Sequence, residues 1–166
     1  MMTHPFDKLS LENGAGIIFT PCPGTKDTSI SDALATLKSQ DMTMILTLLP
    51  DQELQKLSVM EIADECSKLN IIWRQLPIID DQGPTADFEQ NWQSYKDEIV
   101  QLLANGGTIA VHCKGGTGRT GLVIALILTE LDYSFEQILE MVQAIRPKAL
   151  RNEQQLNYFK HYYAKR

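Results

Sequence analysis

The sequence predicts an α/β fold with a mostly parallel central sheet flanked by helices. Over the first two thirds of the chain, short apolar segments of strand length alternate with helical patterns, and the last third shows helical patterns alone. The 166 residues suffice for one sizeable core and are too few for two full domains. We therefore expect a single domain over 1–166, with 1–13 as a loosely ordered N-terminal segment.

The first half of the chain predicts strands separated by a turn and by helices. Apolar segments of strand length lie at 16–19 and 44–49, and an extended segment follows at 71–78. The first of these ends at TPCPG, where two prolines and a glycine require a turn. Between the segments, apolar residues at helical spacing predict a helix capped by Ser31 and another over 54–66.

The second half predicts one more strand among helices. The cleanest amphipathic helix covers 88–102 and stops at Asn105-Gly106-Gly107, and 108–111 reads as a central strand covered on both faces. A nearly all-apolar helix at 120–131 follows, then a helix with a capping box of Ser134 and Gln137, and a last helix from Asn152. In such sheets, ligands bind beyond the carboxyl ends of the strands.

Composition and charge argue against several functional classes. The formal net charge of -6 disfavours a nucleic-acid-binding protein, although a local basic pocket is compatible with it. The N-terminus lacks the pattern of a secretory signal, and the longest apolar run, 121–128, is too short to span a bilayer. Three cysteines without a C-x-x-C pair suggest neither a disulfide framework nor a zinc site. We expect a cytoplasmic protein with no membrane, nucleic-acid or metal partner.

The stretch VHCKGGTGRTG connects the predicted central strand to the apolar helix through a glycine-rich loop. Such a loop points successive backbone N–H groups inward at the positive end of a helix dipole, which makes an anion site. Arg119 adds a planar fork of donors that matches two phosphate oxygens. The candidate phosphate-binding residues are Lys114, Gly115, Gly116, Thr117, Gly118 and Arg119. Lys114 and Thr117 suit solvent as well as an anion.

Cys113 lies at the base of this loop, where the N–H groups, the helix dipole and the guanidinium favour a thiolate. The anion site therefore also creates a nucleophile. Thr120 can hydrogen-bond the sulfur, or its hydroxyl bonds only to backbone at the start of the helix. His112 supports the loop through backbone carbonyls, or is a plain core histidine. The C-x-x-x-x-x-R spacing is weak alone and becomes specific with the histidine, the glycines, and the flanking strand and helix.

The segment HCKGGTGRTG resembles the signature loop of cysteine-based protein phosphatases, in their compact dual-specificity branch. The stretches FTPCPGTK, PIIDDQGPT and ALRNEQQLNYF extend the resemblance along most of the chain. The resemblance implies the compact fold of that branch and hydrolysis of phosphorylated protein substrates without a metal or cofactor. Cys113 would attack phosphorus to form a cysteinyl-phosphate while the loop amides and Arg119 hold the oxygens. Phosphate, sulfate or vanadate would occupy the same loop.

The family's mechanism also requires a carboxylic acid that protonates the leaving oxygen and then activates water. The sequence offers Asp80, Asp81 and Asp87, and an alignment on Pro77-Ile78 places the family's general acid on Asp80. A one-residue change in the loop would exchange Asp80 with Asp81. The resemblance also places a glutamine that positions water at Gln155, where a solvated helix glutamine is the alternative.

Departures from the classical tyrosine phosphatases bear on the substrate. The tryptophan of their W-P-D loop and their phosphotyrosine-recognition motif are missing, which predicts a shallow site that accepts phosphoserine and phosphothreonine beside phosphotyrosine. Lys114 resembles the loop lysine of lipid phosphatases, so a phosphatase of phosphoinositides or other small phosphomonoesters is the alternative. A phosphate-binding adaptor without hydrolysis is a third hypothesis. The oligomeric state is not predicted.

Two further hypotheses concern the surroundings of the loop. Arg146, Lys148 and Arg151 either ring the mouth of the site and attract a dianion, or form a solvated loop. Cys22 is a candidate partner for a protective disulfide with Cys113 under oxidation.

Overall fold

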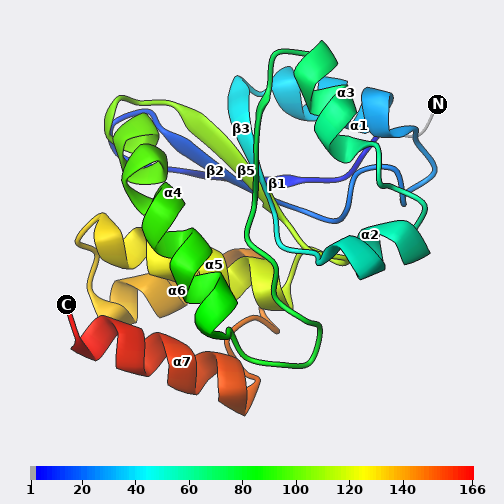
Figure 1. The fold of residues 1–166 in the computed structure, drawn as a ribbon. Coiled ribbons are helices and arrows are strands. Elements are labelled where there is room, and N and C mark those ends of the chain that lie inside the picture. Colours follow the sequence, from blue (N-terminus) through cyan, green and yellow to red (C-terminus); the bar gives the residue numbers. More distant parts are fainter. Residues whose placement is uncertain (1–2) are drawn as a thin grey trace.

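The computed structural model describes residues 3–166 and contains a five-stranded sheet with helices on both faces (Figure 1). The strand order is β1-β2-β5-β3-β4, in which β1 pairs antiparallel with β2 and the other neighbours are parallel. The strands are β1 (Asp7–Ser10), β2 (Gly16–Thr20), β3 (Met42–Thr47), β4 (Ile72–Gln75) and β5 (Thr108–His112). The predicted mostly parallel α/β sheet is confirmed.

The helices follow the predicted order, with shifted boundaries. They are α1 (Ile30–Lys38), α2 (Asp51–Lys56), α3 (Ile62–Lys68), α4 (Ala86–Ala104), α5 (Gly118–Glu130), α6 (Phe135–Ile145) and α7 (Glu153–Ala164). The capping box of Ser134 and Gln137 is present at the start of α6, and Asn152 caps α7. Ser29 caps α1 through the backbone N–H of Asp32, which corrects the expected cap at Ser31.

The single helix expected over 54–66 is wrong, because a tight turn divides it into α2 and α3. Ser58 takes a left-handed conformation with φ 59°, and the N–H of Val59 reaches back to the carbonyl of Leu54 at 2.9 Å. This pattern ends a helix, with serine where glycine is usual. The apolar spacing continues across the break because Leu54, Val59 and Ile62 enter the same core.

Two apolar cores lie on opposite faces of the sheet. The first core packs α4, α5, α6 and α7 against one face, and it contains Phe88, Trp92 and Phe159. The second core packs α1, α2 and α3 against the other face. All five residues of β5 are buried, with Val111 in the first core and Ala110 in the second. The central strand that carries the glycine-rich loop is therefore covered on both faces, as its composition predicts.

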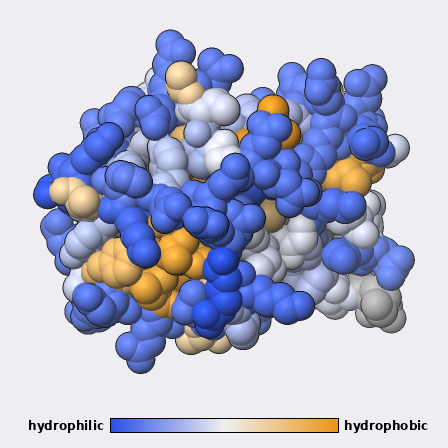
Figure 2. Space-filling model, turned by 90° about the horizontal axis from the view of Figure 1, so that it is seen from below, coloured by the Kyte–Doolittle hydropathy of each residue, from blue (hydrophilic) through white to orange (hydrophobic). Residues whose placement is uncertain are grey.

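Few large apolar side chains lie at the surface of the described chain. The face seen from below is mostly hydrophilic and carries an apolar area at its left (Figure 2). Across residues 3–166, the exposed large hydrophobic residues are Met60, Ile72 and Ile79. Ile79 directly precedes Asp80 and Asp81, two of the three candidate acids.

The N-terminal segment differs from the expectation of a loosely ordered 1–13. Residues 1 and 2 lie outside the described residues, whereas β1 pairs with β2 along its whole length. His4 is buried, and its Nε2 lies 2.6 Å from the hydroxyl of Thr20. The strand sequence DKLS has no apolar alternation, so its order comes from pairing with the neighbouring strand, which no local pattern reveals.

Candidate active site

The glycine-rich loop lies at the carboxyl end of β5, between the ends of β2 and β3, and leads directly into α5. At its centre, Gly116 has φ 80°, and a Cβ there would lie 2.6 Å from the carbonyl carbon of Thr20. Only glycine fits so close to the neighbouring backbone. The N–H of Cys22 donates to the carbonyl of Lys114 at 3.0 Å and ties the loop to the turn after β2.

The sulfur of Cys113 accepts two hydrogen bonds, one from this loop and one from the first turn of α5. The Gly116 N–H lies 3.3 Å from Sγ, and the Thr120 hydroxyl lies 3.2 Å from it. Cys113 is 4% exposed. The sequence left two alternatives for the Thr120 hydroxyl, a hydrogen bond to the sulfur or a bond only to the backbone. In the structure the hydroxyl contacts the sulfur.

Arg119 is 3% exposed and is held by two other segments of the chain. Its Nη1 and Nη2 donate to the two carboxylate oxygens of Glu53, at 2.8 and 2.9 Å. Nη1 also donates to the carbonyl of Ile78 at 2.9 Å. Burial alone would lower the pKa of Arg119, but the Glu53 bonds and nearby negative groups raise it, so the guanidinium remains charged.

These bonds leave one edge of the guanidinium without a hydrogen bond among residues 3–166. The end formed by Nη1 and Nη2 faces Glu53, whereas Nε and the second hydrogen of Nη2 donate to no described residue. Two parallel N–H donors on one edge match two oxygens of a phosphoryl group. Glu53 thus fixes the orientation of Arg119 without occupying that edge.

Glu53 is the site residue that the sequence analysis missed. It lies in α2, more than sixty positions before Arg119, on a helix turn where exposed carboxylates are common. No motif surrounds it. The only available signal is that a buried arginine requires an acidic partner, and that signal does not tell which of the 21 acidic residues supplies it.

His112 lies beneath the loop and joins a chain of hydrogen bonds. Its Nδ1 lies 3.0 Å from the carbonyl oxygen of Cys113, and its Nε2 lies 2.7 Å from the hydroxyl of Thr47. The indole N–H of Trp73 donates to the same hydroxyl at 2.8 Å. Because a carbonyl can only accept, the proton of the neutral ring lies on Nδ1, and Nε2 accepts from Thr47. Burial lowers the pKa of His112 to about 4 and keeps the ring neutral.

Arg146 also supports the loop from below, which corrects its proposed place at the mouth. Its Nε donates to the carbonyl of Gly116 at 3.0 Å, and its Nη1 pairs with Asp7 in β1 at 2.6 Å. Lys148 and Arg151 are exposed and form no ion pair within the described chain. The three positive charges therefore do not act as one group.

Two of the candidate acids lie in the loop between β4 and α4, and the third lies at the start of α4. Asp80 is 62% exposed at its side chain, and its Oδ1 lies 3.6 Å from Nη2 of Arg119. Asp81 is exposed with φ 62°, and its N–H donates to the Asp80 carboxylate at 3.1 Å. Asp87 lies exposed in the first turn of α4. Of the three, Asp80 is the carboxylate that pairs with Arg119.

Gln155 lies in the first turn of α7 and is 9% exposed. Its amide nitrogen would lie 3.2 Å from a Cβ built on Gly118, which places the amide beside the start of α5. The alternative of a solvated helix glutamine is therefore not what the fold produces. The turn between α6 and α7 thus places Gln155, which is far from the glycine-rich loop in the sequence, against the end of that loop.

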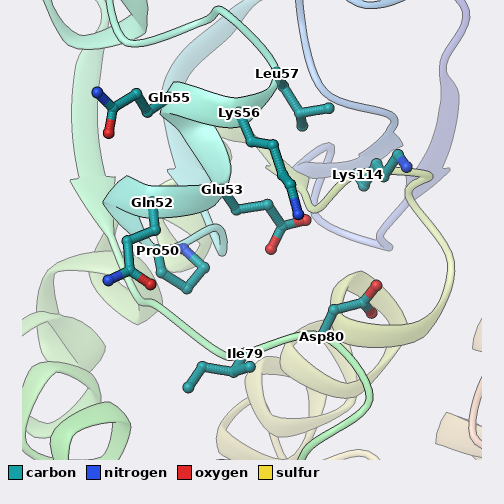
Figure 3. A pocket seen from close by; sticks show the side chains of 9 residues that line it. All are labelled: Pro50, Gln52, Glu53, Gln55, Lys56, Leu57, Ile79, Asp80 and Lys114. Atoms are coloured by element: carbon teal, nitrogen blue, oxygen red, sulfur yellow. The ribbon is translucent and has the colours of Figure 1, made fainter.

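A cavity of about 630 Å³ opens beside the loop, between α2 and the loop of the candidate acids (Figure 3). It is lined by Pro50, Gln52, Glu53, Gln55, Lys56, Leu57, Ile79, Asp80 and Lys114. Figure 3 shows Lys56 and Glu53 extending from α2 on one side and Asp80 approaching from the opposite side. Within residues 3–166, no group of His, Cys, Asp and Glu has the arrangement of a metal site, and none of the helices combines the length and the apolar composition of a membrane span.

Comparison with known proteins identifies the chain. The family model described as "Tc-R-P: Polymorphic toxin system, DSP-PTPase phosphatase" matches residues 22–131. The chain belongs to this family. It is a dual-specificity-type cysteine phosphatase, and the predicted recognition and enzyme class are confirmed.

Individual relatives of this phosphatase agree with the family. Cyclin-dependent kinase inhibitor 3 of Rattus norvegicus is 27% identical over 159 residues, which cover 93% of this chain and 74% of the relative. Protein tyrosine phosphatase type IVA 3 of Homo sapiens is 31% identical over 87 residues, 52% of this chain and 49% of the relative. The stretches FTPCPGTK, PIIDDQGPT and ALRNEQQLNYF most resemble the first of these, also called kinase-associated phosphatase.

The fold of the phosphatase matches a solved structure over nearly its whole length. A crystal structure of kinase-associated phosphatase, in which serine replaces the catalytic-site cysteine, superposes with a TM-score of 0.84 at 26% identity. The superposition covers 99% of this chain and 96% of that chain. The predicted compact dual-specificity phosphatase fold is confirmed.

Proposed function

We propose that this phosphatase hydrolyses phosphotyrosine, phosphoserine and phosphothreonine in proteins through a cysteinyl-phosphate on Cys113, without a metal. The observation that carries the proposal is the pair of hydrogen bonds to the Cys113 sulfur from Gly116 and Thr120, at the start of α5 and beside Arg119. Donors directed at a sulfur stabilise its thiolate, which is the nucleophilic form.

In the first step, the Cys113 thiolate attacks phosphorus, the S–P bond forms, and the P–O bond to the substrate breaks. The equatorial oxygens accept from the backbone N–H groups of 114–118 and from the free edge of Arg119. The electron pair of the P–O bond passes to the leaving oxygen, which takes a proton from Asp80. The hydroxyl of Thr120 stabilises the sulfur again when it departs.

In the second step, water attacks the cysteinyl-phosphate and releases inorganic phosphate. Asp80, now a carboxylate, takes a proton from that water, and Gln155 holds the water in line. The burial of the glutamine amide against the start of α5 supports this role. The buried network of His112, Thr47 and Trp73 positions the loop and takes no part in proton transfer.

The assignment of Asp80 as the general acid is tested by comparing substrates with poor and good leaving groups. Asp80→Ala should lower kcat about 100-fold with phosphoserine, whose leaving oxygen requires a proton, and much less with para-nitrophenyl phosphate. Asp81→Ala is the matched control and should change either rate less than about threefold. A larger loss in the Asp81 variant would assign the acid to that residue instead.

Glu53 should act as a positioning residue for Arg119. Glu53→Gln keeps the side-chain size but replaces one accepting oxygen by a donor that faces the guanidinium. We expect kcat with para-nitrophenyl phosphate to fall about 10- to 100-fold, because a displaced donor loses its alignment in the transition state. Glu98→Gln is the control, since Glu98 forms the same two-oxygen pair with Arg74 in an exposed position. Equal effects of the two substitutions would contradict the role of Glu53.

A substrate panel tests the proposed function. Matched phosphotyrosine, phosphothreonine and phosphoserine peptides should release phosphate in the presence of a chelator, and vanadate should inhibit release. A requirement for added metal would contradict the mechanism. No release from any phosphomonoester, with phosphate still bound, would favour a phosphate-binding adaptor.

Phosphoinositides form the second arm of the panel, because Lys114 projects from the loop beside the cavity. PTPMT1 shares this fold at 17% identity and a TM-score of 0.67, and it was crystallised in complex with PI(5)P. Release of phosphate from the phosphoinositide and from none of the peptides would show that the substrate is a lipid and not a protein. We further propose that 1–166 acts as a single domain in the cytoplasm. We do not extend the link of a relative to cyclin-dependent kinases to this chain.

A further inference from the structure

The cavity beside the loop is larger than a phosphoryl group requires. Its volume of about 630 Å³ lies within the range of sites that hold small ligands, about 300 to 1,000 Å³. The phosphoryl group itself would sit over Cys113, in the loop that forms one edge of the cavity. The remaining space is therefore available to the part of the substrate next to the phosphorylated residue.

Two ammonium groups face this space without a partner. Lys56 comes from the last turn of α2 and Lys114 from the loop, and both are exposed (Figure 3). Neither forms an ion pair or a hydrogen bond with any residue of the described chain, 3–166. Their charges are thus free to meet an anion.

The carboxylates of the same cavity are engaged elsewhere. Glu53 uses both of its oxygens on Arg119, at 2.8 and 2.9 Å. Asp80 lies 3.6 Å from the same guanidinium. Arg119 carries one positive charge against these two carboxylates, and Lys56 and Lys114 then give the five groups together a net positive charge. This local positive potential contrasts with the net charge of -6 of the whole chain.

Apolar side chains complete the lining. Ile79 is 54% exposed, although most large apolar residues of the protein are buried, and Pro50 and Leu57 face it across the cavity. An exposed isoleucine opposite two lysines suits a peptide, whose successive side chains are apolar or charged. The lining therefore favours a peptide over a membrane lipid.

We infer that this cavity is a second recognition site of the phosphatase, in which Lys56 and Lys114 bind an anionic side chain close to the phosphorylated residue of a peptide. The anion is a carboxylate or a second phosphoryl group. The inference rests on the proposed protein phosphatase activity and extends it to a class of substrate sequence. Lys56 then determines specificity and takes no part in the chemical step.

The test compares phosphotyrosine peptides that differ in one residue. One series moves a Glu stepwise along the positions on either side of the phosphotyrosine, and matched series carry Gln, Lys or phosphoserine there. We expect kcat/KM to be about fivefold higher for Glu than for Gln at the favoured position, as for one exposed ion pair, and higher again for phosphoserine. The preference should weaken with added salt.

Substitutions at Lys56 test whether the preference for a Glu near the phosphotyrosine arises in the cavity. Lys56→Gln should abolish the preference for Glu, Lys56→Arg should keep it, and Lys56→Glu should reverse it toward Lys. Lys68→Gln is the matched control, because Lys68 is an exposed helix lysine paired with Glu65 in α3. All variants should hydrolyse para-nitrophenyl phosphate at the rate of the unchanged protein, since Lys56 forms no ion pair with any residue of the described chain.

The outcomes separate the inference from the function on which it rests. Loss of the preference in Lys56→Gln with unchanged hydrolysis of para-nitrophenyl phosphate supports the inference. Hydrolysis of all peptides with equal kcat/KM, or a preference that Lys56→Glu leaves intact, overturns it while the proposed function stands. A preference confined to a phosphoinositide in vesicles overturns the peptide assignment. No hydrolysis of any substrate refutes the proposed function itself.

Discussion

Replacement of Cys113 by serine is expected to abolish turnover and to leave phosphate binding intact. The hydroxyl is smaller than the thiol but can accept from the same donors of Gly116 and Thr120, so we expect the loop to remain in place. A serine hydroxyl stays protonated where a thiol ionises, and the nucleophile is lost. We expect kcat to fall on the order of 10⁴-fold or more, as for other enzymes that lose their nucleophile.

Phosphate binding by calorimetry and phosphate release by the same Cys113→Ser protein are the two measurements. Inorganic phosphate should bind with a Kd within about threefold of the unchanged protein, because the amides and Arg119 remain. Cys66→Ala is the control, since Cys66 is a buried cysteine of α3 in the opposite core. Turnover that survives in Cys113→Ser and falls in Cys66→Ala would remove Cys113 from the mechanism.

Replacement of Arg119 by lysine carries the second largest expected effect. Lysine keeps the positive charge but lacks the planar fork, so it cannot hold Glu53 with one edge and two phosphoryl oxygens with the other. The lost donors act on charge that develops in the transition state. We expect kcat/KM to fall on the order of 10³-fold, the loss caused by removal of one such stabilising donor.

Arg74→Lys provides the matched comparison for this prediction. Arg74 also forms a two-oxygen pair with a glutamate, Glu98, at 2.8 and 2.9 Å, but on the surface beside Tyr95. Its replacement should change kcat/KM less than about twofold, because an exposed pair contributes little. Retention of most activity in Arg119→Lys would show that only the charge of residue 119 matters.

The core of the site was predictable because its residues are adjacent in the sequence. A strand, a glycine-rich loop and a helix follow one another in VHCKGGTGRTG, and backbone geometry alone then directs the amides inward. Cys113, Gly116 and Thr120 therefore meet in the fold as the spacing predicts. The contacts among these three residues are predictable because they depend on the local structure of one continuous segment.

Other features escaped prediction because they join distant segments. The pair of Glu53 with Arg119 requires α2 to lie beside the start of α5. The bond from Arg146 to the carbonyl of Gly116 turns an expected surface charge into a support of the loop. Likewise, β1 has no apolar alternation and is ordered by pairing with β2.

The sequence by itself determined the α/β sheet, the glycine-rich anion loop on its central strand, and the resemblance to dual-specificity phosphatases. These features depend on periodicity and on neighbouring residues, whose relative positions the backbone restricts to a few choices. Only the tertiary structure decided which acid faces Arg119, which carboxylate orients it, and where Lys56 lies. The physical reason is that packing of α2 and the 79–85 loop against the sheet sets those distances, and no local pattern encodes such packing.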